Sequence, residues 1–376
     1  MRIEEKIFDI EGKIDSGLES LESVPPFGLE KEVKEPLQTQ ILSDLTQFHR
    51  RNCSPYDRIL NSFYSSSLTN LIGDYPPFIP ARLLKLVDLK SVPSSEVMMS
   101  LTSSGTSGQT PSRVSLSKSN ARLQNRALVR ILGDFFGTKR QSILIFDEES
   151  TLRGGKEINA RAAGVRGFSS VSREKIIALN ETLDLEEQIV TDFLEGTTDV
   201  PFLAFGFTSV LWEKVILPLE ASGRKFPPNQ GVLIHGGGWK ALVDQAVSPQ
   251  EFSSRARSVL GVRSTHDYYG MAEQTGSIFM ACENRVFHCS NYSDVFVRDP
   301  RTLQVNDFGQ EGLLQVTSVL PRSYPGHSIL TEDIGTIQGE DDCSCGRKGK
   351  YFVVAGRLAQ AEIRGCSDTA TLRPAS

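Results

Sequence analysis

The sequence predicts an α/β fold, and three of its features support that class. Between about residues 100 and 260, short apolar runs typical of strands alternate with longer segments of helical periodicity. From Val286 onward the pattern changes to short strands and turns, which predicts a smaller β-rich part. With 376 residues, 39% of them hydrophobic, the chain is long enough to bury a large core.

The first ninety or so residues are expected to be mainly helical. Charged and apolar residues alternate at helical spacing over residues 4–22, and a second helix is predicted over residues 35–52. Residues 54–80 are rich in aromatic side chains and end in Tyr-Pro-Pro-Phe-Ile-Pro. Because proline restricts the backbone, this ending predicts an ordered loop.

Strands and helices are expected in turn through the middle of the chain. The predicted helices span residues 118–133, 181–194, 212–222 and 249–260. The predicted strands span residues 142–146, 202–205 and 231–234. Residues 153–167 are rich in glycine and arginine, and they predict a loop.

Charge and composition restrict the partners and the compartment. The formal net charge is −5, which argues against nucleic acid as a partner. No apolar run approaches membrane-spanning length, so membrane insertion is not expected. The first residues are polar and acidic, unlike a signal peptide, so a cytoplasmic location is expected. The six cysteines are then expected to be free, metal-bound or reactive rather than paired.

Residues 101–116, LTSSGTSGQTPSRVSL, form the most informative stretch of the chain. Small hydroxyl side chains and closely spaced glycines let O–H and backbone N–H groups converge on phosphate oxygens. The stretch lacks the Gly-Lys-Ser/Thr ending of a Walker loop. A flexible linker is the alternative, but strand-like residues flank the stretch on both sides. The candidate phosphate-binding residues are Thr102, Ser103, Ser104, Gly105, Thr106, Ser107 and Gly108.

Two further segments carry candidate nucleotide-binding residues. In GVLIHGGGWK, residues 231–240, a buried strand runs into three glycines, with His235, Gly236, Gly237 and Lys240 as candidates. The segment is either a tight turn or a ledge for a nucleotide base, because its match to a dinucleotide fingerprint is weak. In HDYYGMAEQ, residues 266–274, Glu273 follows Tyr269 by four residues and can present its carboxylate beside the face of that tyrosine. A turn with an exposed acid is the alternative there.

Two segments near the end complete the pattern. Leu-Thr-Glu-Asp-Ile-Gly, residues 330–335, predicts an acidic turn between strands. An aspartate at this place can accept both hydroxyls of a ribose, although surface turns often hold aspartates as backbone caps. Gly356-Arg357 is followed by AEIRGC, residues 361–366.

In this order and spacing, the five segments resemble the adenylate-forming superfamily of acyl-CoA synthetases and adenylation domains. The family phosphate loop T-S-S-G-T-[ST]-G-x-P resembles residues 102–108, with one extra residue before Pro111. The family signature Y-G-x-[AT]-E is residues 269–273, and the ribose motif T-G-D appears as Thr-Glu-Asp at residues 331–333. The G-R hinge and the following I-[RK]-G are residues 356–357 and 363–365.

The segments HGGGWK, YGMAEQTG, CSCGRKGK and AEIRGCSD look more specifically like the acyl-protein synthetases of bacterial fatty-acid reductase systems, the LuxE family. The resemblance implies an adenylate-forming fold with a large N-terminal domain and a short, truncated C-terminal subdomain. We expect the first over residues 1–330 and the second over residues 331–376. The sequence ends ten residues after Cys366, so the lid and late lysine of an ordinary acyl-CoA synthetase are not expected in full.

The resemblance also implies the reaction and the residue roles. ATP and Mg²⁺ would activate a carboxylic acid, expected to be a fatty acid, and Cys366 would take the acyl group before a partner acyl reductase receives it. Glu273 would hold Mg²⁺, while Tyr269, Gly270 and Asp333 would hold the nucleoside. Lys240 or Arg357 would balance the phosphate charge. The alternatives are an acyl- or aryl-CoA ligase that uses free CoA, a non-catalytic nucleotide-binding subunit, and an inert thiol at position 366.

The other cysteines suggest a candidate structural zinc site. Cys343 and Cys345 lie on one tight turn, and Cys282 with His288 or Cys289 flanks a short hairpin. Two such pairs can complete a tetrahedral zinc site. The spacing is not the usual C-x-x-C, so these cysteines are alternatively small buried residues.

Overall fold

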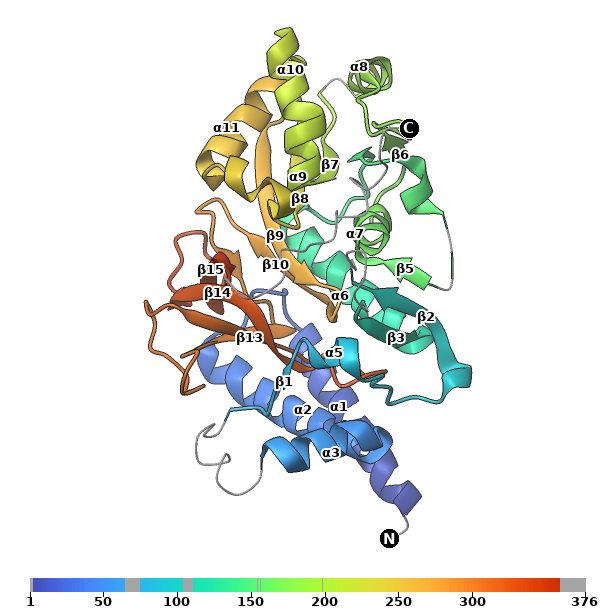
Figure 1. Ribbon diagram of the computed structural model, residues 1–376, viewed down its shortest axis with the longest axis vertical. Helices are drawn as coiled ribbons and strands as arrows, with labels where there is room; N and C mark the ends of the chain where they lie inside the picture. The colour runs from blue at the N-terminus through green and yellow to red at the C-terminus, as the bar shows by residue number, and fades with distance from the viewer. Residues whose placement is uncertain are drawn as a thin grey trace.

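The structure is a computed structural model that describes residues 3–64, 75–103, 111–153, 155, 157–197 and 199–358. For residues 3–9, 240–241 and 275–276 it describes the backbone alone. Within these ranges, a twelve-stranded mixed sheet forms the centre of the molecule, and a three-stranded sheet lies beside it (Figure 1). The order of the large sheet is β12-β13-β14-β15-β11-β10-β9-β8-β7-β4-β6, with β1 paired to β14.

One half of the large sheet is parallel. Its strands are β4 (Ile143–Phe146), β6 (Lys175–Ile177), β7 (Phe202–Phe207), β8 (Gly231–Gly236) and β9 (Ser264–Met271). All residues of β4, β7 and β8 are buried, as expected for parallel strands with helices on both faces. The strands predicted over residues 142–146, 202–205 and 231–234 are therefore confirmed.

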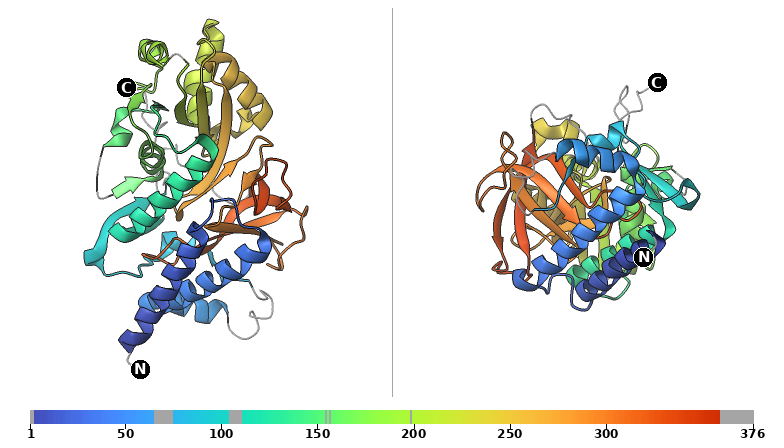
Figure 2. Two further views of the ribbon diagram at one scale, coloured as in Figure 1. Left: turned by 180° about the vertical axis from the view of Figure 1, so that it is seen from behind. Right: turned by 90° about the horizontal axis from the view of Figure 1, so that it is seen from below.

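Helices cover both faces of this parallel half. The helices are α6 (Lys118–Phe136), α7 (Ala160–Ser169), α8 (Glu187–Gly196), α9 (Thr208–Leu211), α10 (Leu217–Ser222) and α11 (Pro249–Leu260), with a π-turn, η3 (Trp212–Ile216), between α9 and α10. Phe168 of α7 stacks on Phe205 of β7 with ring centroids 4.4 Å apart, on the face that α6 also crosses (Figure 2). On the opposite face, Phe252 of α11 contacts His235 of β8 at 4.3 Å.

The ends of the helices follow from local chemistry. The Ser117 side chain accepts a hydrogen bond from the backbone N–H of Asn120 and so caps α6. Ser248 caps α11 in the same way, Pro249 occupies the first turn, and Gly261 ends the helix at φ +68°. The helices predicted over residues 118–133 and 249–260 are thus confirmed.

The other half of the sheet is antiparallel apart from the β1–β14 pairing. Its strands are β1 (Ile79–Pro80), β10 (Gln274–Ala281), β11 (Phe287–His288), β12 (Ser293–Arg298), β13 (Gly312–Ser318), β14 (Ser328–Glu340) and β15 (Lys350–Arg357). The small sheet consists of β3 (Arg113–Ser117), β2 (Val97–Thr102) and β5 (Glu157–Asn159). The expected change to a β-rich pattern after Val286 is confirmed, but not all of these strands are short, because β14 has 13 residues.

The N-terminal helices cover the lower end of the antiparallel half (Figure 1). They are α1 (Ile3–Glu22), α2 (Lys31–Asn52), α3 (Ser54–Phe63) and the short α5 (Leu83–Leu86). Three short 3₁₀ segments complete the described chain: η1 (Ser94–Glu96), η2 (Glu149–Leu152) and η4 (Lys240–Gln245). No helix in the described ranges combines the length and the apolar character that a membrane crossing requires.

Three sequence-based predictions were wrong. Residues 54–63, expected in a loop, form α3 with Pro55 in its first turn. The loop predicted over residues 153–167 contains β5 and most of α7, because β5 gains a parallel partner in β2 and Asn159 caps α7. Position 164 inside α7 favours glycine, because a Cβ there would approach the Phe207 ring to 3.1 Å.

The third wrong prediction concerns the acidic segment at residues 330–335, which lies inside β14 and not in a turn. The β13–β14 register shifts between the Leu313–Ile334 and Gln315–Leu330 pairs, so β14 bulges there. The turn-like segment therefore forms a bulge within a long strand. The proposed domain boundary at residue 330 also falls within β14, and the division of the chain there stays a prediction.

Candidate functional site

The two ends of the predicted phosphate loop leave from one antiparallel ladder. Thr102 of β2 pairs with Arg113 of β3. Just beyond, the Ser103 N–H donates to the Ser112 carbonyl at 3.1 Å, and the Ser112 N–H donates to Ser103 Oγ at 3.0 Å. The predicted loop residues Ser104, Gly105, Thr106, Ser107 and Gly108 lie outside the described residues. The structure thus describes the closed base of the loop.

Glu273 stands beside this base. It belongs to the two-residue turn between β9 and β10, and its neighbour Gln274 pairs with Met271. The Gln274 side chain donates to the carbonyl oxygens of Val316 and Gly326 at 3.1 and 3.0 Å, which anchors the turn. The Ser112 hydroxyl donates to Glu273 Oε1 at 2.6 Å. The candidate magnesium ligand is therefore in direct contact with Ser112, which lies 161 positions away at the base of the predicted phosphate loop.

Asp333 is held by two other predicted site residues. Tyr269 OH donates to Asp333 Oδ2 at 2.7 Å, and Arg357 Nε donates to Oδ1 at 2.7 Å. Burial and the Asp333 carboxylate raise the pKa of Tyr269 well above its usual value, so the phenol remains a donor. The Thr331 hydroxyl accepts from the Asp333 N–H at 3.1 Å, inside the bulge. Tyr269, Asp333 and Arg357 form one group, and the side chain of Asp333 is only 10% exposed.

The glycine segment lies at the end of β8. A Cβ at Gly236 would come within 2.5 Å of the Tyr268 ring, and Gly237 has φ +83°. Both positions therefore favour glycine. Burial lowers the pKa of His235 to about 3, so its ring is neutral, and Nδ1 lies 3.0 Å from Thr208 Oγ1. Lys240 is in η4, where the structure describes its backbone but not its side chain.

Asp267 is a further candidate that the sequence did not predict, and it lies beside the glycine segment at the end of β8. Asp267 pairs with His235 in the β8–β9 register, and its Oδ1 lies 3.7 Å from His235 Nδ1. It shares a face of β9 with Tyr269, since strand residues two apart point to the same side. Desolvation raises the pKa of the Asp267 carboxyl to about 7. Its position two residues before the signature tyrosine was the available signal.

These groups gather outside the carboxyl ends of neighbouring parallel strands, where α/β sheets commonly bind ligands. β8 and β9 supply the glycine segment and Tyr269, β14 supplies Asp333, and β15 supplies Arg357. Gly270 follows Tyr269 in β9. Cys366 lies outside the described residues, so the structure does not place the predicted acyl-accepting thiol.

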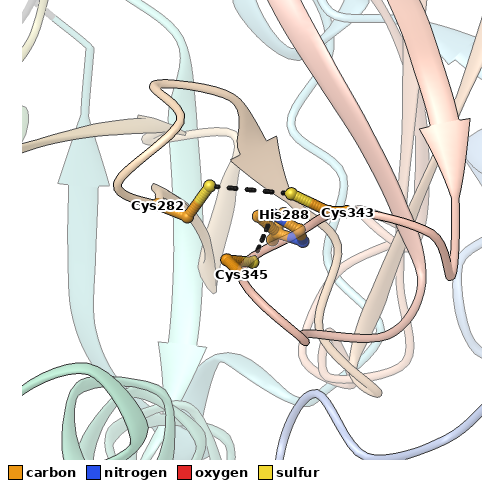
Figure 3. A group of neighbouring side chains, drawn as sticks. All are labelled: Cys282, His288, Cys343 and Cys345. Carbon is orange, nitrogen blue, oxygen red and sulfur yellow. Dashed lines mark hydrogen bonds between the residues drawn. The ribbon is translucent and has the colours of Figure 1, made fainter.

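A second cluster, the Cys/His cluster, consists of Cys282, His288, Cys343 and Cys345 (Figure 3). One ligand atom from each residue lies within 4.8 Å of the others. Cys282 and Cys343 are 3.9 Å apart at their sulfurs, and Cys345 Sγ is 3.4 Å from His288 Nε2. Cys289, the alternative to His288, is not in this group.

The spacing of the Cys/His cluster fits a tetrahedral ion. Zn–S bonds of about 2.3 Å in a tetrahedron place two sulfurs about 3.8 Å apart, close to the separation seen here. Burial raises the pKa of the Cys282 thiol to about 12, so a thiolate at this position needs a neighbouring cation. Three sulfurs and one imidazole nitrogen are a donor set that suits zinc.

Comparisons with known proteins agree on family and fold. Residues 11–372 match the family described as "Acyl-protein synthetase, LuxE". A long-chain-fatty-acid–luciferin-component ligase of Vibrio harveyi is 24% identical over 345 residues, which are 88% of this chain and 86% of that protein.

Among solved structures, the open conformation of 2-hydroxyisobutyryl-CoA ligase with 2-HIB-AMP and CoA superposes with a TM-score of 0.66 at 16% identity. That alignment covers 86% of this chain and 75% of the ligase. The postadenylation state of the same ligase gives a TM-score of 0.64 at 17% identity, over 88% and 69% of the two chains. The fold of this chain is accordingly that of the adenylate-forming ligases.

Proposed function

The chain belongs to the LuxE family of acyl-protein synthetases, and we propose that it converts a fatty acid and ATP into an acyl adenylate and pyrophosphate before passing the acyl group on. The observation that carries the proposal is the contact between Ser112, at the base of the phosphate loop, and Glu273. It supports the proposal because the Glu273 carboxylate, the candidate cation ligand, lies beside the base of the predicted phosphate loop. The name of the Vibrio harveyi relative supports a long-chain fatty acid as substrate.

In the first step, a fatty-acid carboxylate oxygen attacks the α-phosphorus of ATP. A P–O bond forms to the acyl group, and the P–O bond to pyrophosphate breaks. The predicted loop at residues 102–108 would orient the phosphates through hydroxyl and N–H donors. Glu273 would hold Mg²⁺, which offsets the negative charge of the phosphates. Lys240 or Arg357 would add positive charge near the same atoms.

The nucleoside would bind at the group formed by Tyr269, Asp333 and Arg357. A carboxylate oxygen has more than one acceptor site, so Asp333 can accept from ribose hydroxyls while it keeps its present partners. Gly236 and Gly237 remain candidates to line this site, and the space that a Cβ would take at each is filled by the rings of Tyr268 and Phe207.

In the second step, we propose that the thiolate of Cys366 attacks the acyl carbonyl. A thioester bond forms, AMP leaves with the electron pair of the C–O bond, and the thiol proton goes to solvent or a nearby base. Eight peptide units separate Cys366 from Leu358, and such a segment extends at most about 26–29 Å. Leu358 donates its N–H to the Glu332 carbonyl beside Asp333, and a segment of this length would be long enough for the thiol to meet an adenylate bound at Asp333. A partner acyl reductase would then receive the acyl group.

We also propose that the Cys/His cluster holds one structural zinc ion. Cys282 lies in the β10–β11 connection, His288 lies in β11, and the two remaining cysteines lie in the β14–β15 connection, so the ion would tie these segments together. Zinc would supply no chemistry to the reaction, because four protein ligands leave no open position.

Pyrophosphate exchange tests the adenylation step. Labelled pyrophosphate should enter ATP only when a fatty acid and Mg²⁺ are present, and Glu273→Gln should reduce the exchange by about 10²-fold. Exchange that does not depend on added acid would contradict the proposal. A direct comparison of free CoA with a partner reductase as acceptor separates this proposal from a CoA ligase.

A further inference from the structure

Ser112 is a buried side chain in direct contact with the candidate magnesium ligand. It is 0% exposed and stands immediately before β3. Its hydroxyl donates to Glu273 Oε1 at 2.6 Å. Among the residues that the structure describes, Ser112 is the side chain that holds the Glu273 carboxylate.

We infer that Ser112 is a positioning residue, which fixes Oε1 of Glu273 so that Oε2 faces the cation; this inference rests on the proposed role of Glu273. A glutamate on a hairpin turn has three rotatable side-chain bonds, and a cation ligand acts well only when its orientation is set beforehand. The hydrogen bond from Ser112 restricts these rotations. It leaves the second carboxylate oxygen available.

The surroundings of Ser112 are rigid enough for this role. Its backbone makes two hydrogen bonds to Ser103, which hold Ser112 in place immediately before β3. On the other side, Gln274 anchors the turn through the carbonyls of Val316 and Gly326. Both ends of the Ser112–Glu273 bond are thus fixed by contacts with residues outside the segment 104–110. The same bond links the closed base of the phosphate loop to the carboxylate.

A purely structural explanation predicts a different result. A buried hydroxyl needs an acceptor, and Glu273 would then serve only to satisfy Ser112. In that case, loss of the hydroxyl would change stability but would leave the magnesium requirement of the reaction unchanged. In a positioning role, the loss appears mainly in the reaction rate and in the magnesium concentration that it requires.

The experiment compares Ser112→Ala with Ser115→Ala in the full-length protein. Ser115 lies three residues further along, within β3, and is 3% exposed, so the control makes the same chemical change in a similarly buried place. For Ser112→Ala we expect acid-dependent pyrophosphate exchange to fall by about 10- to 100-fold at saturating substrates, and half-maximal Mg²⁺ to rise several-fold. Ser115→Ala should match wild type in both, and Ser112→Thr should recover most of the rate.

A double-mutant cycle with Glu273→Gln gives the deciding readout. If Ser112 acts through the carboxylate, Ser112→Ala should reduce the rate of the Glu273→Gln protein by less than two-fold. An equal reduction in both backgrounds, or an unchanged Mg²⁺ requirement in the single variant, would overturn the inference. Wild-type protein without acid-dependent exchange would instead refute the proposed function. Magnesium-dependent ATP binding, measured by calorimetry, should weaken in Ser112→Ala whether or not the acid has been identified.

Discussion

At the scale of single residues, Asp333 connects the candidate nucleotide site to the end of the described chain. It accepts from Tyr269 and from Arg357, so the β9 strand and the β15 strand meet at one carboxylate. Arg357 is followed directly by Leu358 and then by the segment that carries Cys366. Any movement of Arg357 that accompanies nucleotide binding would therefore act on the base of that segment.

The covalent step makes a prediction about a single thiol. Incubation of wild-type protein with ATP, Mg²⁺ and a fatty acid should give a hydroxylamine-sensitive adduct on the peptide that contains Cys366. Cys366→Ala should lose the adduct but keep pyrophosphate exchange, because the adenylate forms without the thiol. Mass spectrometry of the intact protein and its peptides measures both the acyl group and its position.

Two comparisons complete the test of Cys366. Cys53→Ala serves as the control, because Cys53 is buried in the core between α2 and α3, and it should leave the adduct unchanged. Acylation of the Cys366→Ala protein, or transfer from wild type to free CoA alone, would contradict the assignment and favour a CoA ligase.

At the scale of elements, the β14–β15 hairpin carries two separate features at its two ends. Asp333 and Arg357 pair near its open end, whereas Cys343 and Cys345 lie in the connection between the strands. Lys350 of the same hairpin bonds to Asp294 at 2.8 Å and is 9% exposed. The hairpin is thus fixed to its neighbours at several points, which keeps the carboxylate of Asp333 in place.

The zinc proposal makes a prediction about this hairpin. Elemental analysis of purified wild-type protein should find about one zinc per chain, and the Cys343→Ser/Cys345→Ser double variant should lose it. The double variant should unfold at lower denaturant concentration but still bind ATP, because the cluster is separate from the Asp333 group.

Cys289→Ser is the matched control for metal content, since Cys289 neighbours His288 but does not belong to the Cys/His cluster. It should keep the zinc. Wild-type protein that is metal-free and of unchanged stability after treatment with a chelator would refute the zinc site.

At the scale of the whole molecule, buried neutral histidines join the N-terminal helices to the sheet. His49 of α2 stacks on His327, which lies just before β14, with ring centroids 5.0 Å apart. His49 bonds to Ser91, and His327 to Thr46, at 2.7 and 2.9 Å. Burial lowers the pKa of His327 to about 3 and that of His49 well below its usual value. Both rings must therefore remain neutral for this contact to form.

This contact predicts how stability depends on pH. Between pH 6.5 and the folded pKa near 3, the unfolded chain binds a proton at His327 that the folded protein does not. The contribution of neutral His327 to the free energy of unfolding is therefore greatest above pH 6.5 and decreases as the pH falls. His327 alone should contribute a loss of about 2 kcal/mol between pH 8 and pH 5.

Urea unfolding at pH 5, 6, 7 and 8 measures this loss. His327→Gln keeps a polar side chain beside Thr46 but cannot titrate, so its free energy of unfolding should decline less steeply below pH 6.5. Stability that is constant or rises toward pH 5 in wild type would show that these histidines are protonated in the folded protein.

Much of the fold was predictable because its signals are local. The helix over residues 249–260 has a serine cap, a proline in its first turn and a glycine at its end, all adjacent in the sequence. The strands β4, β7 and β8 appear as short apolar runs because both of their faces are buried. The sequence predicts loops for the residues of α3, β5 and α7, because the stabilising contacts are not local. β5 pairs with the distant strand β2, and Gly164 allows α7 to pack closely against the sheet.

The sequence by itself determined the chemistry of this protein: the hydroxyl- and glycine-rich loop, the tyrosine–glutamate signature, the acidic ribose motif and the family to which they point. Only the tertiary structure decided which of these groups touch. It placed Ser112 on Glu273, Asp333 between Tyr269 and Arg357, and His288 rather than Cys289 with the three cysteines. The physical reason is that residue types and local periodicity are written along the chain, whereas strand order, register and bulges bring together residues far apart in it.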